Sequence, residues 1–465
     1  MYRKALDEYF AQHRQEFTDD LCRLLTIESV KGEAAPGMPY GPGPAEALDA
    51  AMALARNYGF AVTDHEHRVA TVDHGDGTPY LDILAHLDVV PGGDGWTVTA
   101  PFVPVVKGDL IYGRGTSDDK GPAMAALYAM RAVKELNIPL TKNVRLILGT
   151  DEECGSSDVH WYYARNPESP MTFSPDAEFP LVNIEKGRVH GRFSAQWEPS
   201  SPLPRISSLR CGQRANVVSR TAEADILGLA AAQAAPAAAE AQKDTGISYR
   251  LTDTAQGLHI LAQGVSAHGS TPDKGNNPLT GLLALLCRLP LADGSMPYLT
   301  ALHRLFPHGD FFGSAVGIAM KDGLAGPTTA ALTVLHLEDN ALSGEFDVRT
   351  SLSATEENTD DVLRRALTEA GFTYQCEVSQ PHHVPADSPL VQELLHCYEM
   401  YTGQKGEALA MGGATYVHDL KNGVAFGCIP PEVDTHMHGA DEWMSIDTLL
   451  LSAKMFAQAI IDLCS

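Results

Sequence analysis

Histidine and acidic residues recur in this sequence at the ends of apolar runs, where side chains with chemical roles are often placed. The clearest case is the apolar stretch 80–85, which leads into His86 and, two residues later, Asp88. Side chains two apart on a strand point to the same side, so both would leave the tip of a buried strand together. Taken alone, a His-x-Asp pair is more often a hydrogen-bonded surface pair, and its meaning depends on the residues further along the chain.

A second group of acids comes after two glycines. Gly113 and Gly115 precede Asp118 and Asp119, and an Ala/Met/Leu-rich helix is predicted to run on to Leu136. Glycines allow close approach of the backbone, and the start of a helix stabilises anions. An ordinary N-cap explains one of the two carboxylates, but it does not explain two with a lysine beside them.

Three adjacent acids end the predicted strand 143–150, namely Asp151, Glu152 and Glu153. Neighbouring carboxylates repel one another, so this run needs either solvent or a bound cation. Asp176 lies in the rigid turn 174–180, and His438 lies in the segment 435–443. Acids and histidines therefore accumulate at points far apart in the sequence.

Two histidines and three carboxylates at these points match the donors that two divalent ions need if one carboxylate bridges them. The set is His86, Asp118, Glu153, Asp176 and His438. Two ions about 3.5 to 4 Å apart can hold a hydroxide between them and polarise a carbonyl group. Glu152 would then take the proton of that water as general base and return it to a leaving amine. Asp88 would bond the second nitrogen of His86 and fix its tautomer.

The elements that would position these residues alternate in the first part of the chain. Apolar spacing predicts helices over 5–25, 45–58, 122–136 and 156–164, and strands over 69–72, 81–85 and 143–150. Strands that alternate with helices and end in acids or histidine are typical of an α/β sheet with its site at the carboxyl edge.

The pattern changes after Gly187. Strands are predicted over 189–197, 259–264, 328–337 and 341–349, helices over 278–289 and 355–370, and an Ala-rich helical stretch over 222–242. This favours a separate, partly antiparallel α+β domain, with the chain returning near 381–385. The last part of the chain is predicted to hold helices over 390–400 and 446–463 and a strand over 423–426. Two domains are expected at 465 residues.

The composition excludes several classes of function. A net charge of −25 does not suit nucleic acid, because a phosphate backbone requires clustered lysine and arginine. The eight cysteines are scattered without a Cys-x-x-Cys pair, which is typical of free thiols in a reducing compartment. The N-terminal residues offer no apolar run for a signal peptide, and no stretch reaches the ~20 apolar residues of a membrane span. We expect a cytoplasmic protein that binds neither nucleic acid nor membrane.

Five motifs in this order resemble those of the M20 family of di-zinc peptidases and acylases, and within it the PepV-like bacterial dipeptidases. They are His86-Leu87-Asp88, the stretch 113–121, Asp151-Glu152-Glu153, Ser174-Pro175-Asp176, and the stretch 438–442. The resemblance covers nearly the whole chain. It implies an α/β fold in which a phosphorylase/hydrolase-like mixed-sheet catalytic domain is interrupted by an enlarged α+β lid domain. The boundaries would be 1–186 and 383–465 for the catalytic di-metal domain and 187–382 for the lid.

The resemblance also implies a role for each site residue. Asp118 would bridge two divalent ions, preferably zinc with manganese or cobalt as alternatives, and a cis peptide would join it to Asp119. The remaining ligands would be His86 and Asp176 on one ion and Glu153 and His438 on the other.

Four residues outside the metal set would contact the substrate on this resemblance. Asn216 and His268 of the lid would reach the developing oxyanion, and Arg349 the substrate carboxylate, which are the donor and the cation those charges require. Gly413 would lie beside the substrate. His268 could also be an ordinary lid histidine, but its Ser-Ala-His-Gly-Ser setting favours the functional interpretation.

We therefore expect a monomeric metal-dependent dipeptidase acting on small dipeptides with free amino and carboxyl termini. The chain departs from this family pattern in one motif. Relatives tend to have Gly-Gly-Gly-Thr-Tyr-Ala-Arg, whereas residues 412–418 of this chain end in His418. The missing arginine leaves the dipeptide preference open. An N-acyl-amino-acid amidohydrolase (deacylase or desuccinylase) of the same family is the first alternative, and Arg349 favours dipeptides over it. A non-catalytic metal- or peptide-binding protein is the second, and the presence of Glu152 argues against it.

Overall fold

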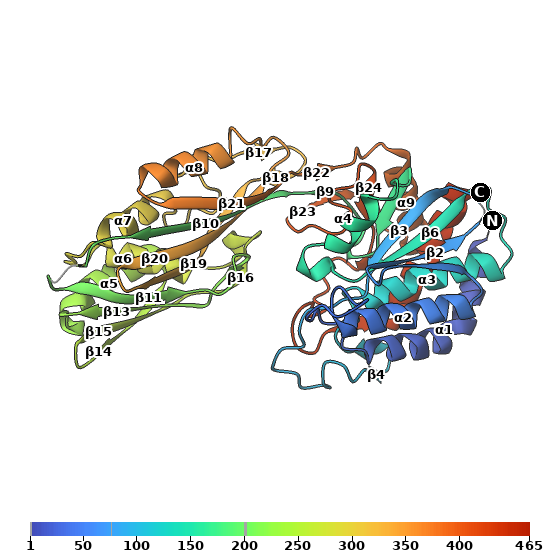
Figure 1. Cartoon of the computed structure of the whole chain (residues 1–465), viewed down its shortest axis with the longest axis horizontal. Helices are drawn as coiled ribbons and strands as arrows, with labels where there is room; N and C mark the ends of the chain where they lie inside the picture. The colour runs from blue at the N-terminus through green and yellow to red at the C-terminus, as the bar shows by residue number, and fades with distance from the viewer. Residues whose placement is uncertain (1, 76, 200–201) are drawn as a thin grey trace. The chain divides into compact units, whose positions relative to one another are not determined.

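The chain folds into two compact units in a computed structural model that describes residues 2–75, 77–199 and 202–465 (Figure 1). The first unit comprises Met1–Ile184, His383–Leu409 and Ala414–Ser465. The second comprises Glu185–His382 and the short segment Ala410–Gly413.

A mixed nine-stranded sheet forms the centre of the first unit in the described part of the chain. Its order is β1 (Ala61–His65), β2 (Val69–His74), β6 (Asn143–Gly149), β3 (Pro79–His86), β7 (Met171–Ser174), β24 (Gly423–Ala425), β9 (Leu181–Glu185) and β22 (His382–His383), with β23 (Ala408–Met411) beside β9. Pairing is parallel from β6 through β3 and β7 to β24. It is antiparallel between β1 and β2 and between β2 and β6. The carboxyl ends of β3, β6 and β7 therefore meet at one edge, where sites of open α/β sheets lie.

Helices cover both faces of this sheet. One large apolar core joins it to α1 (Arg3–Leu25), α2 (Pro42–Asn57), α3 (Lys120–Glu135), α9 (Pro389–Thr402) and α10 (Ile446–Cys464). A smaller core joins the opposite face to α4 (Ser157–Tyr163). The alternation along β3 decides this division: Ile83 and Ala85 pack in the large core and Leu84 in the small one, as expected of a strand whose successive side chains point to opposite faces.

Three short pairings shape the loops at the carboxyl edge. The strand β5 (Leu110–Tyr112) pairs with β4 (Val105–Lys107) and with β26 (Trp443–Ser445), and β8 (Ala177–Glu178) pairs with β25 (Cys428–Ile429). A single 3₁₀ turn, η1 (Glu152–Cys154), comes after β6. The β5–β26 pairing matters most, because it brings the segment after residue 435 beside the segment before residue 118.

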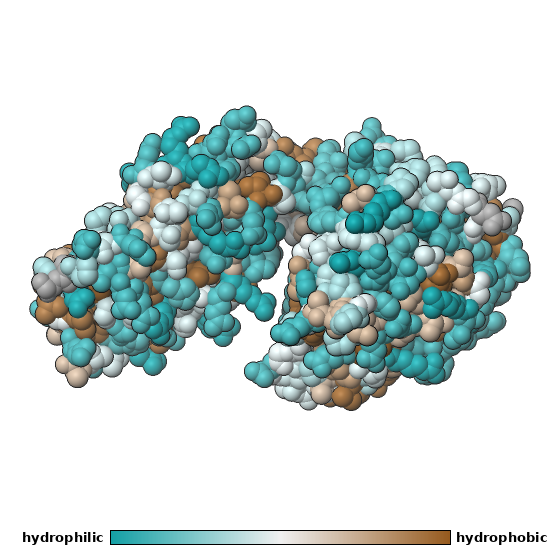
Figure 2. Space-filling model, viewed as in Figure 1, coloured by the Kyte–Doolittle hydropathy of each residue, from teal (hydrophilic) through white to brown (hydrophobic). Residues whose placement is uncertain are grey.

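The second unit is an antiparallel sheet of eight strands with helices on one face. The strand order is β14 (Ser248–Asp253), β15 (Gly257–Gln263), β13 (Thr221–Leu227), β11 (Arg205–Cys211), β19 (Thr329–Glu338), β20 (Ala341–Thr350), β10 (Gly187–Gln196) and β21 (Thr373–Ser379). Its core is shared with α5 (Ala231–Thr245), α6 (Pro278–Leu286), α7 (Met296–Leu305) and α8 (Asp360–Glu369). Exposed ion pairs such as Arg210–Glu338 occupy the uncovered face, and hydrophilic residues cover most of the face of each unit seen in Figure 2.

Small elements complete the second unit. They are the two-stranded ladders β12 (Val217–Val218) with β16 (Ala267–His268) and β17 (Lys321–Asp322) with β18 (Gly326–Pro327), and the turn η2 (Pro272–Lys274). Among the described residues, no helix combines the length and the apolar character needed to cross a bilayer.

The periodicity-based predictions are confirmed for every helix and strand of the first unit that they named, within a few residues at the ends. One prediction in the second unit is wrong: the Ala-rich stretch 222–242 is a helix only from Ala231, and residues 221–227 form strand β13. Ala222, Ala224 and Ile226 are buried and alternate with polar residues, so the period of two outweighs the helical preference of alanine. The helix predicted over 355–370 begins only at Asp360.

Candidate functional site

Asp118 lies between two histidines. Its Oδ1 is 2.9 Å from His86 Nε2, and its Oδ2 is 2.8 Å from His438 Nε2. His86 Nε2 is also 3.5 Å from Asp176 Oδ2, and His438 Nε2 is 3.2 Å from Glu153 Oε1. The five side chains thus form two groups of three that share Asp118, and within each group the ligand atoms lie within 4.8 Å of one another.

Separate elements deliver these side chains to the carboxyl edge of the sheet. His86 is the last residue of β3, Glu153 lies in η1 after β6, and Asp176 lies just after β7. Asp118 precedes α3, and the peptide bond that joins it to Asp119 is cis. His438 lies in the loop before β26. The sequence-predicted ligands are all brought together.

The simple capping interpretation of the two aspartates does not hold. Asp119 occupies the N-cap position of α3 but makes no side-chain capping hydrogen bond. Instead its Oδ2 accepts the backbone N–H of His86 at 2.9 Å. The side chain of Asp119 therefore joins the start of α3 to the tip of β3, beside both Asp118 and His86.

The donor set fits divalent metal ions. His86 Nε2 and Glu153 Oε1 are buried without a hydrogen-bond partner among the described residues. Burial and the charge of Asp118 raise the pKa of both Glu153 and Asp176. Burial alone would raise the pKa of Asp118 as well, but the adjacent imidazoles of His438 and His86 hold it below its usual value. Imidazole nitrogens and carboxylate oxygens crowded in this way are the ligands of borderline and hard cations, and such cations would relieve the repulsion among the acids.

Asp88 acts through two different groups. Its backbone oxygen lies 3.0 Å from His86 Nδ1, whereas its Oδ1 is 3.5 Å from that nitrogen. Because a carbonyl oxygen only accepts, this contact places the proton on Nδ1 and leaves Nε2 to face Asp118. The carboxylate oxygens of Asp88 accept the N–H groups of Glu152 and Glu153, each at 3.1 Å. Asp88 therefore fixes the tautomer through its main chain and the η1 turn through its side chain.

Glu152 is half-buried and lies next to Glu153 in the η1 turn. Burial raises the pKa of its carboxyl well above the usual value, and the charges of Asp176, Glu153 and Asp118 act in the same direction, while His86 opposes them. A carboxyl whose pKa is raised holds a proton more readily once it has accepted one. The position and the pKa direction suit the general-base role expected of this residue.

One interaction at the site was not foreseen from the sequence. The carboxylate of Glu442 accepts hydrogen bonds from Arg114 Nη1, Gly115 N, Ser117 N and Ser117 Oγ. Glu442 and Arg114 belong to motifs that the sequence singles out, but nothing in the sequence pairs them. The contact ties the loop before Asp118 to the loop of His438.

In the second unit, Asn216 and His268 lie side by side. Val217 pairs with His268 in the β12–β16 ladder, and Gly269 N donates to Asn216 O at 2.7 Å. Ser270 N donates to His268 Nδ1 at 3.2 Å, so the neutral imidazole carries its proton on Nε2. A donor at Nε2 is the group that a developing oxyanion requires.

Arg349 is a buried arginine held at two points within the second unit. Its Nε donates to Asp347 Oδ2 at 2.8 Å and its Nη1 to Gly412 O at 2.5 Å, next to Gly413. Asp347 also accepts from Arg188 Nε at 2.7 Å. Asp347 is a second residue that sequence reasoning missed, although its position two residues before Arg349 on a strand places both on one side.

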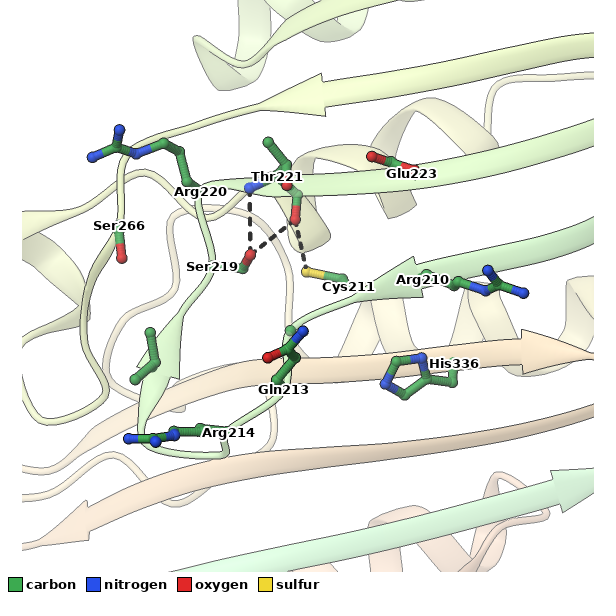
Figure 3. A pocket seen from close by; sticks show the side chains of 12 residues that line it. Arg210, Cys211, Gln213, Arg214, Ser219, Arg220, Thr221, Glu223, Ser266 and His336 are labelled. Carbon is green, nitrogen blue, oxygen red and sulfur yellow. Dashed lines mark hydrogen bonds between the residues drawn. The ribbon is translucent and has the colours of Figure 1, made fainter. Parts of the chain in front are cut away.

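A pocket of about 520 Å³ lies in the second unit, at the end of β11 and β13 (Figure 3). Arg210, Arg214 and Arg220 line it, but Figure 3 shows that their guanidinium groups point away from one another. Because they do not converge on one point, the arrangement does not form an anion site. The pocket contains none of the predicted site residues.

Comparison with known proteins agrees with this architecture. The fold matches the crystal structure of human carnosine dipeptidase 1 with a TM-score of 0.63 at 14% identity, covering 100% of this chain and 99% of that one. Two bacterial relatives are similar in sequence along their whole length. The putative dipeptidase YtjP of Bacillus subtilis (strain 168) is 34% identical over 456 residues, covering 97% of each chain. The Beta-Ala-Xaa dipeptidase of Lactobacillus delbrueckii subsp. lactis is 32% identical over 450 residues, covering 96% of this chain and 95% of the relative.

The mixed-sheet unit and the antiparallel unit are thus the catalytic and lid domains of an M20-type peptidase fold. The family description "Peptidase family M20/M25/M40" matches residues 83–462. The chain belongs to this family, and it is a peptide-bond hydrolase.

Proposed function

We propose that the chain is a metal-dependent dipeptidase that hydrolyses dipeptides with free amino and carboxyl termini. The observation that carries this proposal is Asp118, whose two oxygens each face a different histidine at 2.9 and 2.8 Å. A carboxylate placed between two histidines in this way would suit a ligand shared by the two ions of a hydrolytic centre. The name of the Lactobacillus relative, a Beta-Ala-Xaa dipeptidase, supports dipeptides as the substrate class.

Two ions would be held by the two groups of residues. His86, Asp118 and Asp176 would hold one, and Asp118, Glu153 and His438 the other. Zinc is favoured by the mixture of imidazole and carboxylate donors, with manganese and cobalt as alternatives. When bound, such ions supply Lewis acidity toward the carbonyl group and lower the pKa of water.

The proton transfers would be carried out by Glu152. Its carboxylate would accept the proton of the attacking water and, once protonated, donate it to the leaving amine, so the residue ends the cycle as it began. Asp88 would keep Glu152 in place, because its carboxylate binds the N–H groups at the start of η1. The raised pKa of Glu152 supports this role, since burial favours its protonated form after the first transfer.

The lid residues would recognise the substrate. His268 Nε2–H and the side-chain amide of Asn216 are neutral donors suited to a developing oxyanion. Arg349 is suited to the free carboxylate of the dipeptide, because the hydrogen bonds from its Nε and Nη1 fix the plane of the guanidinium group. Gly413 comes directly after the carbonyl that accepts from Arg349, so a substrate bound there would pass close to the main chain.

The experiment is a hydrolysis assay on metal-free protein to which zinc, manganese or cobalt is restored. The substrates are free dipeptides, the matching dipeptide amides, and N-acetyl and N-succinyl amino acids. We expect turnover of free dipeptides that depends on added metal. Failure to hydrolyse any dipeptide with all three metals would overturn the proposal. Turnover of the N-acyl amino acids alone would identify an amidohydrolase, and metal binding without any turnover would identify a binding protein.

Two further parts of the proposal concern the cell. All eight cysteines are free thiols, which supports a cytoplasmic location. We also propose that the enzyme is a monomer with a large lid, and sedimentation equilibrium of the metal-loaded protein tests this. A mass of twice 49.9 kDa would contradict it.

A further inference from the structure

A second group of metal-ligating side chains lies on two helices of the first unit. Glu393 and Cys397 are one turn apart on α9, and Asp462 is near the end of α10. One donor atom of each residue lies within 4.8 Å of the other two. None of the three residues belongs to the group around Asp118.

The two carboxylates of this group face each other at close range. Burial raises the pKa of Glu393, and the charge of Asp462 raises it further, while His396 opposes them. Within the described ranges, no lysine or arginine forms a salt bridge with either carboxylate. Glu393 is half-buried and Asp462 is exposed, so the pair has solvent on one side and no basic partner among the described residues.

The thiol beside them is fully buried and also lacks a hydrogen bond. Cys397 has no exposed surface, and among the described residues its sulfur has no hydrogen-bond partner. The ionisable groups that act on it are the same two carboxylates, which together with burial raise its pKa. The buried sulfur lies within 4.8 Å of a carboxylate oxygen of each acid, which is an observation separate from the repulsion between the acids.

Gln458, one turn before Asp462 on α10, adds a further buried oxygen. Its side chain is almost fully buried, and its Nε2 donates to Asp462 Oδ2 at 2.7 Å. Its Oε1 has no hydrogen-bond partner in the part of the chain that the structure describes. Buried polar atoms are nearly always paired, so this unpaired oxygen, on a side chain that is hydrogen-bonded to Asp462, is a second unusual feature beside the group.

The geometry fits a tetrahedral cation. Zinc binds thiolate sulfur at about 2.3 Å and carboxylate oxygen at about 2.0 to 2.2 Å, so its ligand atoms lie roughly 3.3 to 3.8 Å apart. Donor atoms already within 4.8 Å reach that spacing by small side-chain rotations. Residues four apart on a helix share one face, which gives Glu393 and Cys397 the arrangement needed for a joint ligand pair.

We propose that Glu393, Cys397 and Asp462 form an additional metal site that binds one borderline divalent cation, of the zinc class, through one thiolate and two carboxylates. Binding replaces the thiol proton of Cys397 with the metal and releases that proton to solvent. The ion joins α9 to α10, so its role is structural. The site has no part in the chemistry proposed for the group around Asp118.

Cobalt provides the test, because a thiolate bound to Co²⁺ gives a charge-transfer absorption band in the near ultraviolet. The group around Asp118 contains no sulfur ligand, so this band reports the new site and does not depend on turnover. We expect titration of the full chain with Co²⁺ to produce a band whose final intensity corresponds to one thiolate-bound ion per chain, in addition to the ions taken up around Asp118, and which disappears on adding Zn²⁺. Absence of the band at saturating Co²⁺ would overturn the proposal.

Three variants locate the site. Cys397→Ser should abolish the band, whereas Cys154→Ser, which changes an exposed cysteine next to Glu153, should retain it. A band that persists in Cys397→Ser would refute the assignment. Glu393→Gln should weaken Co²⁺ binding at least tenfold and leave dipeptide hydrolysis unchanged. If Cys397→Ser does not fold, Glu393→Gln tests the proposal instead, because Glu393 is only half-buried. An unchanged affinity of this variant for Co²⁺ would contradict the proposal.

Discussion

Arg114 donates from Nη1 to Glu442 Oε2 at 2.5 Å, and both side chains are fully buried. The two residues are 328 positions apart in the chain. Arg114 lies shortly before Asp118, and Glu442 lies at the same spacing after His438. This ion pair therefore fixes the separation of two proposed metal ligands, Asp118 and His438, which come from distant parts of the sequence.

Glu442→Gln should destabilise the protein by about 3 to 5 kcal/mol, because it leaves the buried charge of Arg114 unpaired. Denaturant unfolding measures the free energy, and metal affinity should fall with it. The matched control is Glu377→Gln, which breaks the exposed pair with Arg192 and should cost less than about 1 kcal/mol. Equal costs for the two substitutions would show that the buried pair has no special structural weight.

Glu152→Gln should lower kcat by a factor of about 10² to 10⁴, since it removes the proposed proton acceptor and keeps the shape of the side chain. Metal content should stay unchanged, because Glu152 is not one of the proposed ligands. Kinetics and elemental analysis on the same samples check this, with the exposed Glu33→Gln as control. Substantial turnover in the Gln variant would mean that another group takes the proton.

His268→Ala should reduce kcat by about 10²-fold, as expected for loss of one oxyanion donor. Its metal content should equal that of the wild type. His336→Ala, a change at an exposed histidine of the same domain, serves as control and should leave kcat unaltered. Wild-type kinetics for His268→Ala would remove the lid histidine from the mechanism.

Arg349→Lys should raise KM for a free dipeptide by about 10- to 100-fold, because an ammonium group cannot reproduce a planar guanidinium contact to a carboxylate. KM for the corresponding dipeptide amide should change little. The comparison of the two substrates separates recognition of the carboxylate from disturbance of Asp347. Arg250→Lys, at an exposed position of the lid, provides the control, and equal KM changes for acid and amide would argue against the assignment.

Asp82→Asn should stabilise the protein increasingly as pH rises. Burial raises the pKa of Asp82 from 3.8 to about 6, so below pH 3.8 neither state is charged and the aspartate costs nothing. Between these values the unfolded chain loses the proton first, and above pH 6 the full cost, about 3 kcal/mol, is present in the native state. Unfolding free energies of both proteins at pH 4 and pH 7 test this, and a difference that shrinks with pH would contradict the stated pKa direction.

The sequence alone determined the candidate site residues and much of the local structure. Apolar runs that end in His86, Glu152 and Glu153 marked strands β3 and β6 and their common edge, because strand patterns repeat every two residues and are visible in a short window. The order of the motifs indicated the M20 family, and the family match along residues 83–462 agrees. The alternation that makes 221–227 a strand was also present, but its alanines suggested a helix.

Only the tertiary structure decided how distant segments meet. The partnership of Arg114 with Glu442, the split role of the Asp88 main chain and carboxylate, and the contact of Arg349 with Asp347 all depend on which loops lie together in space. The group formed by Cys397 with residues of two helices has the same origin. Periodicity records which face of its own element a residue occupies, whereas the partner across an interface is set by packing between elements that no local pattern encodes.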